Sequence, residues 1–171
     1  MTATFLYFAY GSNLGRRRLC AAHRAPSAVF ESVGWLDGFR LSFDKYGPSA
    51  SGDSGKCDCH RTGIGTDRIY GALYRVALAE RDALDAVEGL GISYKRVERE
   101  VQSAVGPRTA STYLALRKRA GLLPFHWYKQ HVLVGAQEVG LPAAYVEAIR
   151  TQPSVDDPDL ARNAREMAIY R

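Results

Sequence analysis

The sequence predicts an α+β protein with a mixed or antiparallel sheet, curled or closed, and helices on one side. Turn signals at Asp37-Gly38 and Gly106-Pro107 separate strand-like segments, which is typical of antiparallel neighbours. Helical segments are interspersed among the strands without the regular alternation of a doubly wound sheet. The chain of 171 residues has no internal repeat or linker, so we expect one domain over residues 1–171.

The first expected element is a buried strand that runs into a turn. Residues 5–10 are all apolar or aromatic, and Gly11-Ser12-Asn13 ends the run. Glycine accepts positive φ, and serine and asparagine hydrogen-bond locally, so such a turn leaves backbone N–H groups unpaired. These groups can hold an anion or a carbonyl oxygen. The same residues also fit an ordinary core strand followed by a helix N-cap.

The next elements are expected in the first half of the chain. Residues 14–23 form a short helix with Ser12 or Asn13 as its N-cap. Residues 29–36 and 39–43 form a hairpin across Asp37-Gly38. Residues 45–60 are polar and aperiodic, which predicts a variable, mobile loop. A short strand is expected to begin at residues 63–65, and residues 69–76 are a clearer strand.

Helices become more frequent in the second half. Residues 79–87 have apolar positions at helical spacing, and Glu88-Gly89 ends this helix. Residues 94–101 alternate and are expected to pair with residues 109–116. Residues 126–139 form a helix that Gly140 closes, and Pro142 opens another through residue 151. A polar tail from about residue 153 contains one helical segment at 158–169.

Composition excludes several classes of protein. Hydrophobic residues make up 46% and charged residues 24%, as in soluble globular chains, and no apolar run could span a bilayer. The N-terminus lacks the features of a signal peptide, and three cysteines argue against a disulfide framework, so we expect a cytoplasmic protein. The net charge of +5 includes basic clusters at 16–18 and 117–119. Without a nucleic-acid motif these indicate a solvated face, so we expect neither a nucleic acid nor a membrane partner.

Glu88 is the most informative acidic residue. It lies in the last turn of an expected helix, where the negative end of the helix dipole disfavours a carboxylate. Its neighbours Val87, Leu90 and Ile92 are apolar, and partial burial would raise its pKa further. A carboxyl group of this kind is suited to general acid or base catalysis near neutral pH. An ordinary surface glutamate at a helix end is the alternative.

Metal and cofactor chemistry lack support in the sequence. Cys57-Asp58-Cys59-His60 does not have the usual C-x-x-C spacing and has no second ligand pair, so no metal site is predicted. Cys20 is expected to be an inert buried thiol. There is no P-loop, Rossmann fingerprint or nucleophile elbow, and we expect no cofactor.

Four separated blocks resemble the gamma-glutamylcyclotransferase family. They are Y-F-A-Y-G-S-N-L at 7–14, R-A-P-S-A at 24–28, L-D-A-V-E-G at 84–89, and a Y-K, G-A, G-L-P, Y pattern from 128 to 145. The resemblance covers most of residues 5–150. It implies a small β-barrel flanked by helices. It also implies cyclisation of a gamma-glutamyl group to 5-oxoproline, with release of an amino acid or amine and without a cofactor.

The resemblance also assigns roles by position. Glu88 matches the catalytic acid/base. The substrate-binding residues are Tyr7, Phe8, Ala9, Tyr10, Gly11, Ser12 and Asn13, together with Tyr94 and Tyr128. The N–H groups of Gly11-Ser12-Asn13 fit either the oxyanion or the substrate carboxylate, and the sequence does not decide between them.

Some questions stay open at this point. Residues 45–60 depart from the family pattern, which leaves the released amine unassigned. The alternatives are a non-catalytic module that binds gamma-glutamyl compounds or 5-oxoproline, and a cyclotransferase specialised for a gamma-glutamylated amine. Dimers are seen in the family, so a homodimer is a further expectation.

Overall fold

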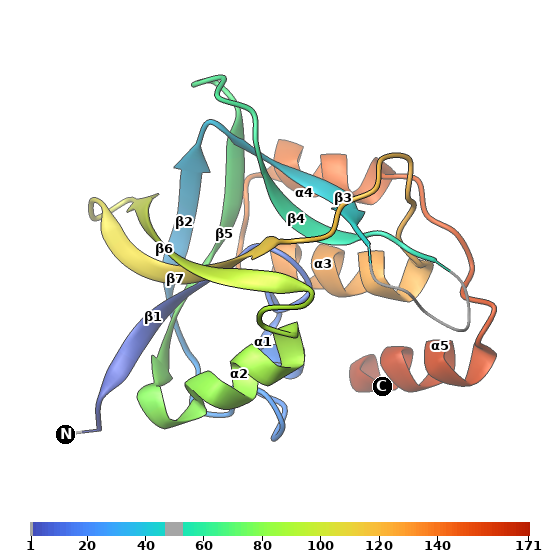
Figure 1. Cartoon of the computed structure of the whole chain (residues 1–171), viewed down its shortest axis with the longest axis horizontal. Helices are drawn as coiled ribbons and strands as arrows, with labels where there is room; N and C mark the ends of the chain where they lie inside the picture. Colours follow the sequence, from blue (N-terminus) through green and yellow to red (C-terminus); the bar gives the residue numbers. More distant parts are fainter. Residues whose placement is uncertain (1, 47–52) are drawn as a thin grey trace.

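A closed barrel forms the centre of the computed structural model, which describes residues 2–46 and 53–171 (Figure 1). The strand order is β1-β5-β2-β6-β7. The strands are β1 (Thr4–Ala9), β2 (Val29–Asp37), β5 (Arg68–Ala77), β6 (Tyr94–Ser103) and β7 (Arg108–Ala115). Neighbours are antiparallel except β1 and β7, whose parallel contact at Tyr7 and Ser111 closes the barrel. The predicted mixed, closed sheet is therefore confirmed.

A second sheet consists of β3 (Phe39–Lys45) and β4 (Lys56–Arg61), which contact barrel strands β5 and β7. The predicted hairpin across Asp37-Gly38 is wrong, because β2 pairs with β5 and β6 while β3 pairs with β4. Gly38 has a φ of 78° and donates its N–H to the Asp67 carbonyl at 2.8 Å. This corner turns the chain out of the barrel instead of back along β2.

Part of the predicted loop at 45–60 is also wrong. Residues 56–61 form β4, whose register pairs Leu41 with Cys59. A polar sequence is held here as a strand because β3 supplies the backbone partners. Residues 47–52 lie outside the described residues. The strand expected at 63–65 is instead a turn, in which the N–H groups of Thr62 and Gly63 both reach the Gly38 carbonyl.

The helices follow the prediction except at the first. They are α1 (Arg16–Leu19), α2 (Arg81–Glu88) after a 3₁₀ turn (Leu78–Glu80), α3 (His126–Glu138), α4 (Ala143–Thr151) and α5 (Leu160–Met167) before a 3₁₀ turn (Ala168–Tyr170). Figure 1 shows α3, α4 and α5 together on one side of the barrel. None of the described helices is long and apolar enough to cross a membrane.

The helix expected at 14–23 is reduced to a single short turn. Gly15 occupies its N-cap without a side-chain hydrogen bond. Asn13 does not cap it because the Asn13 side chain points to other partners, described below. Helix α3 approaches the backbone here so closely that a Cβ on Gly135 would lie 2.4 Å from the Gly15 nitrogen. The turn after β1 is therefore clamped between the barrel and α3.

Candidate active site

Helix α2 places Glu88 through contacts one turn earlier. Asp85 is buried, accepts a hydrogen bond from the Tyr113 hydroxyl at 2.6 Å, and forms an ion pair with Arg96. These contacts attach α2 to β6 and β7. Gly89 then ends the helix with a φ of 66°, a conformation that glycine adopts without steric cost. Glu88 is thus fixed at the C-terminal end of α2, beside the turn that follows β1.

The turn after β1 holds one oxygen of the Glu88 carboxyl group. Asn13 donates from Nδ2 to Glu88 Oε1 at 2.7 Å and to the Tyr7 hydroxyl at 3.2 Å. Arg24 donates to Asn13 Oδ1 at 3.2 Å. Because a guanidinium group only donates, Arg24 orients the amide oxygen toward itself and the NH₂ toward Glu88. The Arg24–Asn13–Glu88 chain uses only Oε1, and among the described residues nothing bonds Glu88 Oε2, which can therefore take a proton.

A hollow surrounds this carboxyl group. Its lining consists of Tyr7, Tyr10, Gly11, Ser12, Asn13, Cys57, Glu88, Tyr94, Tyr113 and Tyr128. The structure brings together all the predicted site residues except Phe8 and Ala9, whose side chains are fully buried in the core. The hollow is narrow, with about 30 Å³ of free space. This is roughly the volume of one water, so a glutamyl chain enters only when lining side chains move.

Strand β4 forms the wall opposite the turn. The Tyr94 hydroxyl donates to the Cys57 carbonyl at 2.8 Å, and the Cys57 N–H donates to the Tyr128 hydroxyl at 3.0 Å. A Cβ on Gly11 would lie 2.9 Å from Cys57 Cβ, so glycine is required for this approach. Two of the predicted substrate-binding tyrosines thus also hold the wall in place.

The charge of Glu88 is set by opposing effects. Burial raises the pKa of Glu88 because it disfavours the carboxylate, in the direction expected from the sequence. The Arg24 guanidinium, the Asn13 hydrogen bond, Arg18 and Lys45 each act to lower this pKa. Burial also raises the pKa values of Tyr7, Tyr94 and Tyr128, so these phenols stay protonated and can donate hydrogen bonds.

Backbone donors complete the hollow. The Leu14 N–H is taken by the Gly11 carbonyl at 3.0 Å. The N–H groups of Gly11, Ser12 and Asn13 find no acceptor among residues 2–46 and 53–171. Free N–H groups in a turn of this kind bind anions or carbonyl oxygens.

Sequence reasoning missed four contributors to this site. Arg24 and Asp85 lie inside two of the blocks that carried the family resemblance, so the blocks themselves were the signal. Tyr113 lies in a strand that was correctly predicted, but the sequence does not show which face its side chain occupies. Cys57 gave no signal, because residues 45–60 were expected to be a loop.

Acidic and sulfur side chains of β4 belong to other contacts. Asp44, Asp58 and His60 place ligand atoms within 4.8 Å of one another. However, Asp58 is fully buried, forms an ion pair with Lys118 and accepts the Ala115 N–H at 2.7 Å. Burial raises the pKa values of Cys57 and Cys59 to about 12, so both remain thiols. These side chains join β4 to β7.

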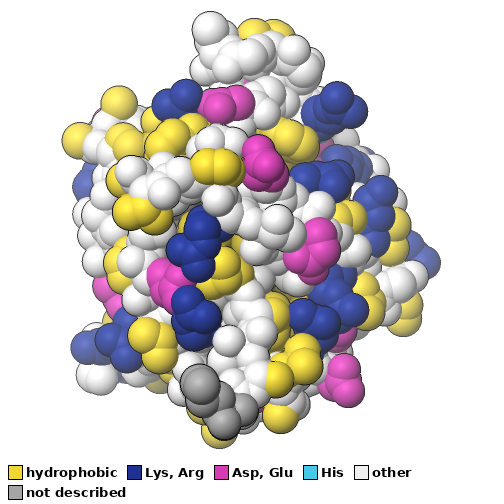
Figure 2. Space-filling view, turned by 90° about the vertical axis from the view of Figure 1, so that its left-hand side faces the viewer, with side chains coloured by type: hydrophobic (Ala, Val, Ile, Leu, Met, Phe, Trp, Pro, Cys, Tyr) yellow, Lys and Arg dark blue, Asp and Glu magenta, His cyan; other side chains and the backbone are white. Residues whose placement is uncertain are grey.

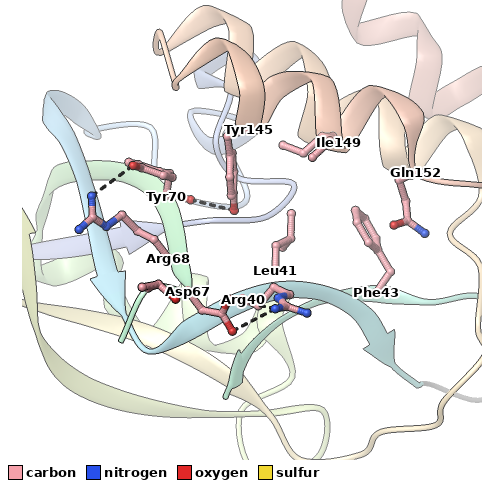
Figure 3. Close-up of a pocket in the computed structure, with 11 residues that line it drawn as sticks. Arg40, Leu41, Phe43, Asp67, Arg68, Tyr70, Tyr145, Ile149 and Gln152 are labelled. Atoms are coloured by element: carbon pink, nitrogen blue, oxygen red, sulfur yellow. Dashed lines mark hydrogen bonds and ion pairs between the residues drawn. The ribbon is translucent and has the colours of Figure 1, made fainter. Parts of the chain in front are cut away.

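A larger cavity of about 450 Å³ lies between β3, the start of β5 and α4 (Figure 3). Tyr145 and Ile149 project from α4 toward Leu41 on β3 (Figure 3). The acidic group in its lining, Asp67, is bound by Arg40 at 2.9 Å. The cavity does not contain Glu88, so size alone does not identify the site where proton transfer can occur.

Comparison with known proteins decides the family. The chain is 32% identical over 155 residues to a gamma-glutamylcyclotransferase of Mus musculus, covering 86% of this chain and 78% of the relative. The Homo sapiens gamma-glutamylcyclotransferase is 30% identical over 154 residues, with the same coverage. The chain belongs to the gamma-glutamylcyclotransferase family.

Two further comparisons agree with this membership. A solved gamma-glutamyl cyclotransferase superposes with a TM-score of 0.81 at 30% identity, over 90% of both chains. Residues 68–149 also match the AIG2-like family. The family predicted from the four sequence blocks is therefore confirmed. The matched residues 68–149 include Glu88, Tyr94 and Tyr128, whereas the turn after β1 lies before them.

Proposed function

We propose that this protein is a gamma-glutamylcyclotransferase, in which Glu88 moves the protons and the turn after β1 binds the glutamyl group. One observation carries the proposal: a half-buried carboxyl group in a hollow has one oxygen held by Asn13, and no described residue bonds the other, which can take a proton. The substrate is a gamma-glutamyl compound, and the products are 5-oxoproline and an amino acid or amine.

The reaction moves two protons and closes one ring. Glu88 accepts a proton from the substrate's α-ammonium group, and the free amine attacks its own γ-carbonyl carbon. The bond between that carbon and the leaving nitrogen then breaks. Glu88 returns this proton to the departing nitrogen and then passes on the second proton, which the attack leaves on the ring nitrogen. The amine therefore departs in its ammonium form, the carboxylate is regenerated and no water is consumed. Each step uses a group of the substrate or of Glu88, and none requires a covalent enzyme intermediate.

The raised pKa of Glu88 suits the first transfer. An α-amino group titrates near about 8 and a free glutamate near about 4.3, and each unit of mismatch costs about 1.4 kcal/mol. Burial narrows this gap. The positive charges of Arg24, Arg18 and Lys45 limit this rise in the pKa of Glu88. The limit matters because a carboxyl group that stayed protonated could not act as the base.

Positioning supplies the rest of the catalysis. Holding the amine against the carbonyl is worth up to roughly 7–11 kcal/mol at ideal alignment. The free N–H groups of Gly11, Ser12 and Asn13 bind either the oxyanion of the ring-closing step or the substrate's α-carboxylate. The hydroxyls of Tyr7, Tyr94 and Tyr128 orient the glutamyl chain.

The remaining expectations stay predictions, with some support from the surface. Arg18 pairs with Glu166, Lys118 with Asp58, and Arg119 with Asp53, so members of both basic clusters already have acidic partners. Figure 2 shows basic, acidic and hydrophobic side chains interspersed on the barrel face. These features favour a solvated face over a nucleic-acid surface. The cytoplasmic location and the homodimer are carried forward as predictions.

The test is incubation with gamma-glutamyl-L-alanine, gamma-glutamylethylamine and glutathione, with 5-oxoproline as the measured product. The wild type should form it from at least one of them. Glu88→Gln removes the proton acceptor but keeps the shape, and should lower kcat/KM by at least about a hundredfold.

Two results would contradict the proposal. A Glu88→Gln variant within a fewfold of the wild type would remove Glu88 from the mechanism. Tight binding of 5-oxoproline without any turnover by the wild type would instead identify a non-catalytic binding module.

A further inference from the structure

Lys45, at the end of β3, has an ammonium group that neither gives nor takes a proton in the transfers above. The residue is only 8% exposed. Its Nζ lies 5.2 Å from the centre of the Tyr94 ring, one wall of the hollow. Among the described residues no carboxylate lies within ion-pair distance of it, and residues 47–52, Gly-Pro-Ser-Ala-Ser-Gly, contain no acidic side chain.

Neighbouring lysines show that this arrangement is unusual. Lys118, whose backbone bridges to Lys45, pairs with the buried Asp58. Lys56, opposite Lys45 in the β3–β4 register, lies over Trp127 and Tyr128 at 4.1 and 4.3 Å and also over Phe125. Lys45 has neither a carboxylate nor such a cage of rings. An ammonium group on a mostly buried side chain with one ring contact and no ionic partner is poorly compensated, which favours an anion that arrives from outside the chain.

The charges around Lys45 favour an anion as well. Burial lowers the pKa of Lys45, the Glu88 charge opposes this, and the nearby Arg117 adds to it. Lys45 is therefore within electrostatic reach of both the Glu88 carboxylate and a second cation, Arg117. A bound anion would offset the repulsion between Lys45 and Arg117.

The position of Lys45 indicates that it contacts the leaving group of the substrate and not the glutamyl group. The hollow's own lining includes the free N–H groups of Gly11, Ser12 and Asn13 but not Lys45. Glu88 must reach the leaving nitrogen, so the leaving group begins at Glu88 and extends away from the turn after β1. Lys45 lies over the ring of Tyr94, which lines the hollow, and is within electrostatic reach of Glu88.

We propose that Lys45 binds the carboxylate of the departing amino acid, so that this protein prefers gamma-glutamyl amino acids to gamma-glutamyl amines. The inference rests on the proposed cyclotransferase activity. The ammonium–carboxylate contact exists before and during ring closure. It therefore lowers KM for carboxylate-bearing substrates more than it raises kcat.

Two substrates that differ by one group test this directly. Gamma-glutamyl-L-alanine and gamma-glutamylethylamine differ only in the carboxylate of the leaving group. We expect the wild type to prefer the alanine compound by about tenfold to a hundredfold in kcat/KM, the usual range for a charged hydrogen bond. Lys45→Met keeps an apolar stem and should reduce the preference to within about threefold, through a higher KM for the alanine compound. Loss of the Lys45 charge also raises the pKa of Glu88, which affects both compounds equally and does not change the preference.

Matched variants separate this role from general effects. Lys45→Arg keeps the positive charge and should keep the preference. Lys95→Met removes an exposed lysine next to Tyr94 and should change neither substrate. Because the preference is a ratio measured on one preparation, partial unfolding of a variant cancels from it.

The outcomes are distinguishable. No 5-oxoproline from any gamma-glutamyl substrate with the wild type would overturn the proposed function itself. Equal kcat/KM for the two compounds in the wild type, or an unchanged preference in Lys45→Met, would overturn the role of Lys45 while leaving the activity intact.

Discussion

Two glutamates of this chain lie near the same arginine and have opposite properties. Burial raises the pKa of Glu88, whereas hydrogen bonds from His131 and the Arg18 charge lower the pKa of Glu166 to about 2. Arg18 acts to lower both pKa values, so it does not explain the difference. The difference comes from burial, which dominates at Glu88, and from the partners: Glu88 has one amide donor, while Glu166 has a direct ion pair and a histidine.

The comparison separates a carboxyl group placed for chemistry from one placed for structure. Glu166 joins α5 to α1 through Arg18 at 2.7 Å and to α3 through His131 at 3.0 Å. His131 is buried and also contacts the Tyr170 hydroxyl at 2.6 Å. Both contacts of Glu166, which share its Oε2, therefore anchor the C-terminal segment. Glu88 instead lines the hollow and has a single neutral donor, Asn13, so its carboxyl group stays within reach of a substrate.

The largest effect should come from replacing each of the two glutamates by glutamine. Glu88→Gln should lose at least about a hundredfold in kcat/KM while its stability stays equal or rises, since a buried charge is removed. Glu166→Gln should keep activity within about threefold. Steady-state kinetics and thermal unfolding of both variants check this. A Glu166→Gln variant as inactive as Glu88→Gln would break the distinction between the two glutamates.

The sequence identified only one of these two glutamates as a candidate functional residue. Glu88 stood out because a helix end, Gly89 and apolar neighbours are local features. The importance of Glu166 depends on His131 and Arg18, which are distant in sequence and meet only through α1, α3 and α5. Its helix was predicted, but nothing in a charged tail marks one acid among several.

The same limit explains the errors in the fold. Strand positions were predictable because apolar runs and turn residues are local signals. The predicted hairpin at Asp37-Gly38 was wrong because this dipeptide indicates a turn but not which strands pair on either side of it. Strand β4 was missed because its pairing with β3, and not its composition, makes it a strand. The Asn13 side chain was expected to cap a helix, because its competing partner Glu88 is far away in sequence.

The next effect concerns stability. Glu166→Gln replaces a charged acceptor by a neutral one, and we expect a loss of about 2 kcal/mol in the free energy of unfolding. Denaturant titration at neutral pH measures it. Gln137→Ala on α3, an exposed position, is the matched control and should stay within about 0.5 kcal/mol. A Glu166→Gln variant as stable as the wild type would show that α5 is held by other contacts.

Lowering the pH should weaken the same Glu166 contacts in the wild type and so reduce its stability. The folded pKa of Glu166 lies below the unfolded value of about 4.3, so its stabilisation is complete above that value and is lost as pH falls toward about 2. Burial lowers the pKa of His131, so the unfolded state binds its proton more readily, and stability falls further below about pH 6.5. Denaturation midpoints from pH 7 to 3 should fall less steeply in Glu166→Gln. Parallel curves for the two proteins would contradict this.

A smaller effect should appear in the pH dependence of catalysis. Asn13→Ala removes the donor that favours the ionised form of Glu88, so the pKa of Glu88 rises further. We expect kcat/KM at neutral pH to fall about tenfold and its acid limb to move to higher pH, because the base must be deprotonated. Asn13→Asp is unsuited as a control because it adds a like charge. A uniform loss at every pH would assign Asn13 to substrate binding alone.

The smallest effect separates charge from orientation at Arg24. Arg24→Gln can still donate to Asn13 Oδ1, so the amide orientation is kept while the charge that most strongly lowers the pKa of Glu88 is lost. The acid limb of kcat/KM should move to higher pH, with a loss of about threefold at neutral pH, and Arg24→Lys should resemble the wild type. The same substitution should leave the stability contributed by Glu166 intact. If Arg24→Gln instead equals Asn13→Ala in both size and pH shift, then orientation of the amide, and not charge, is what Arg24 contributes to Glu88.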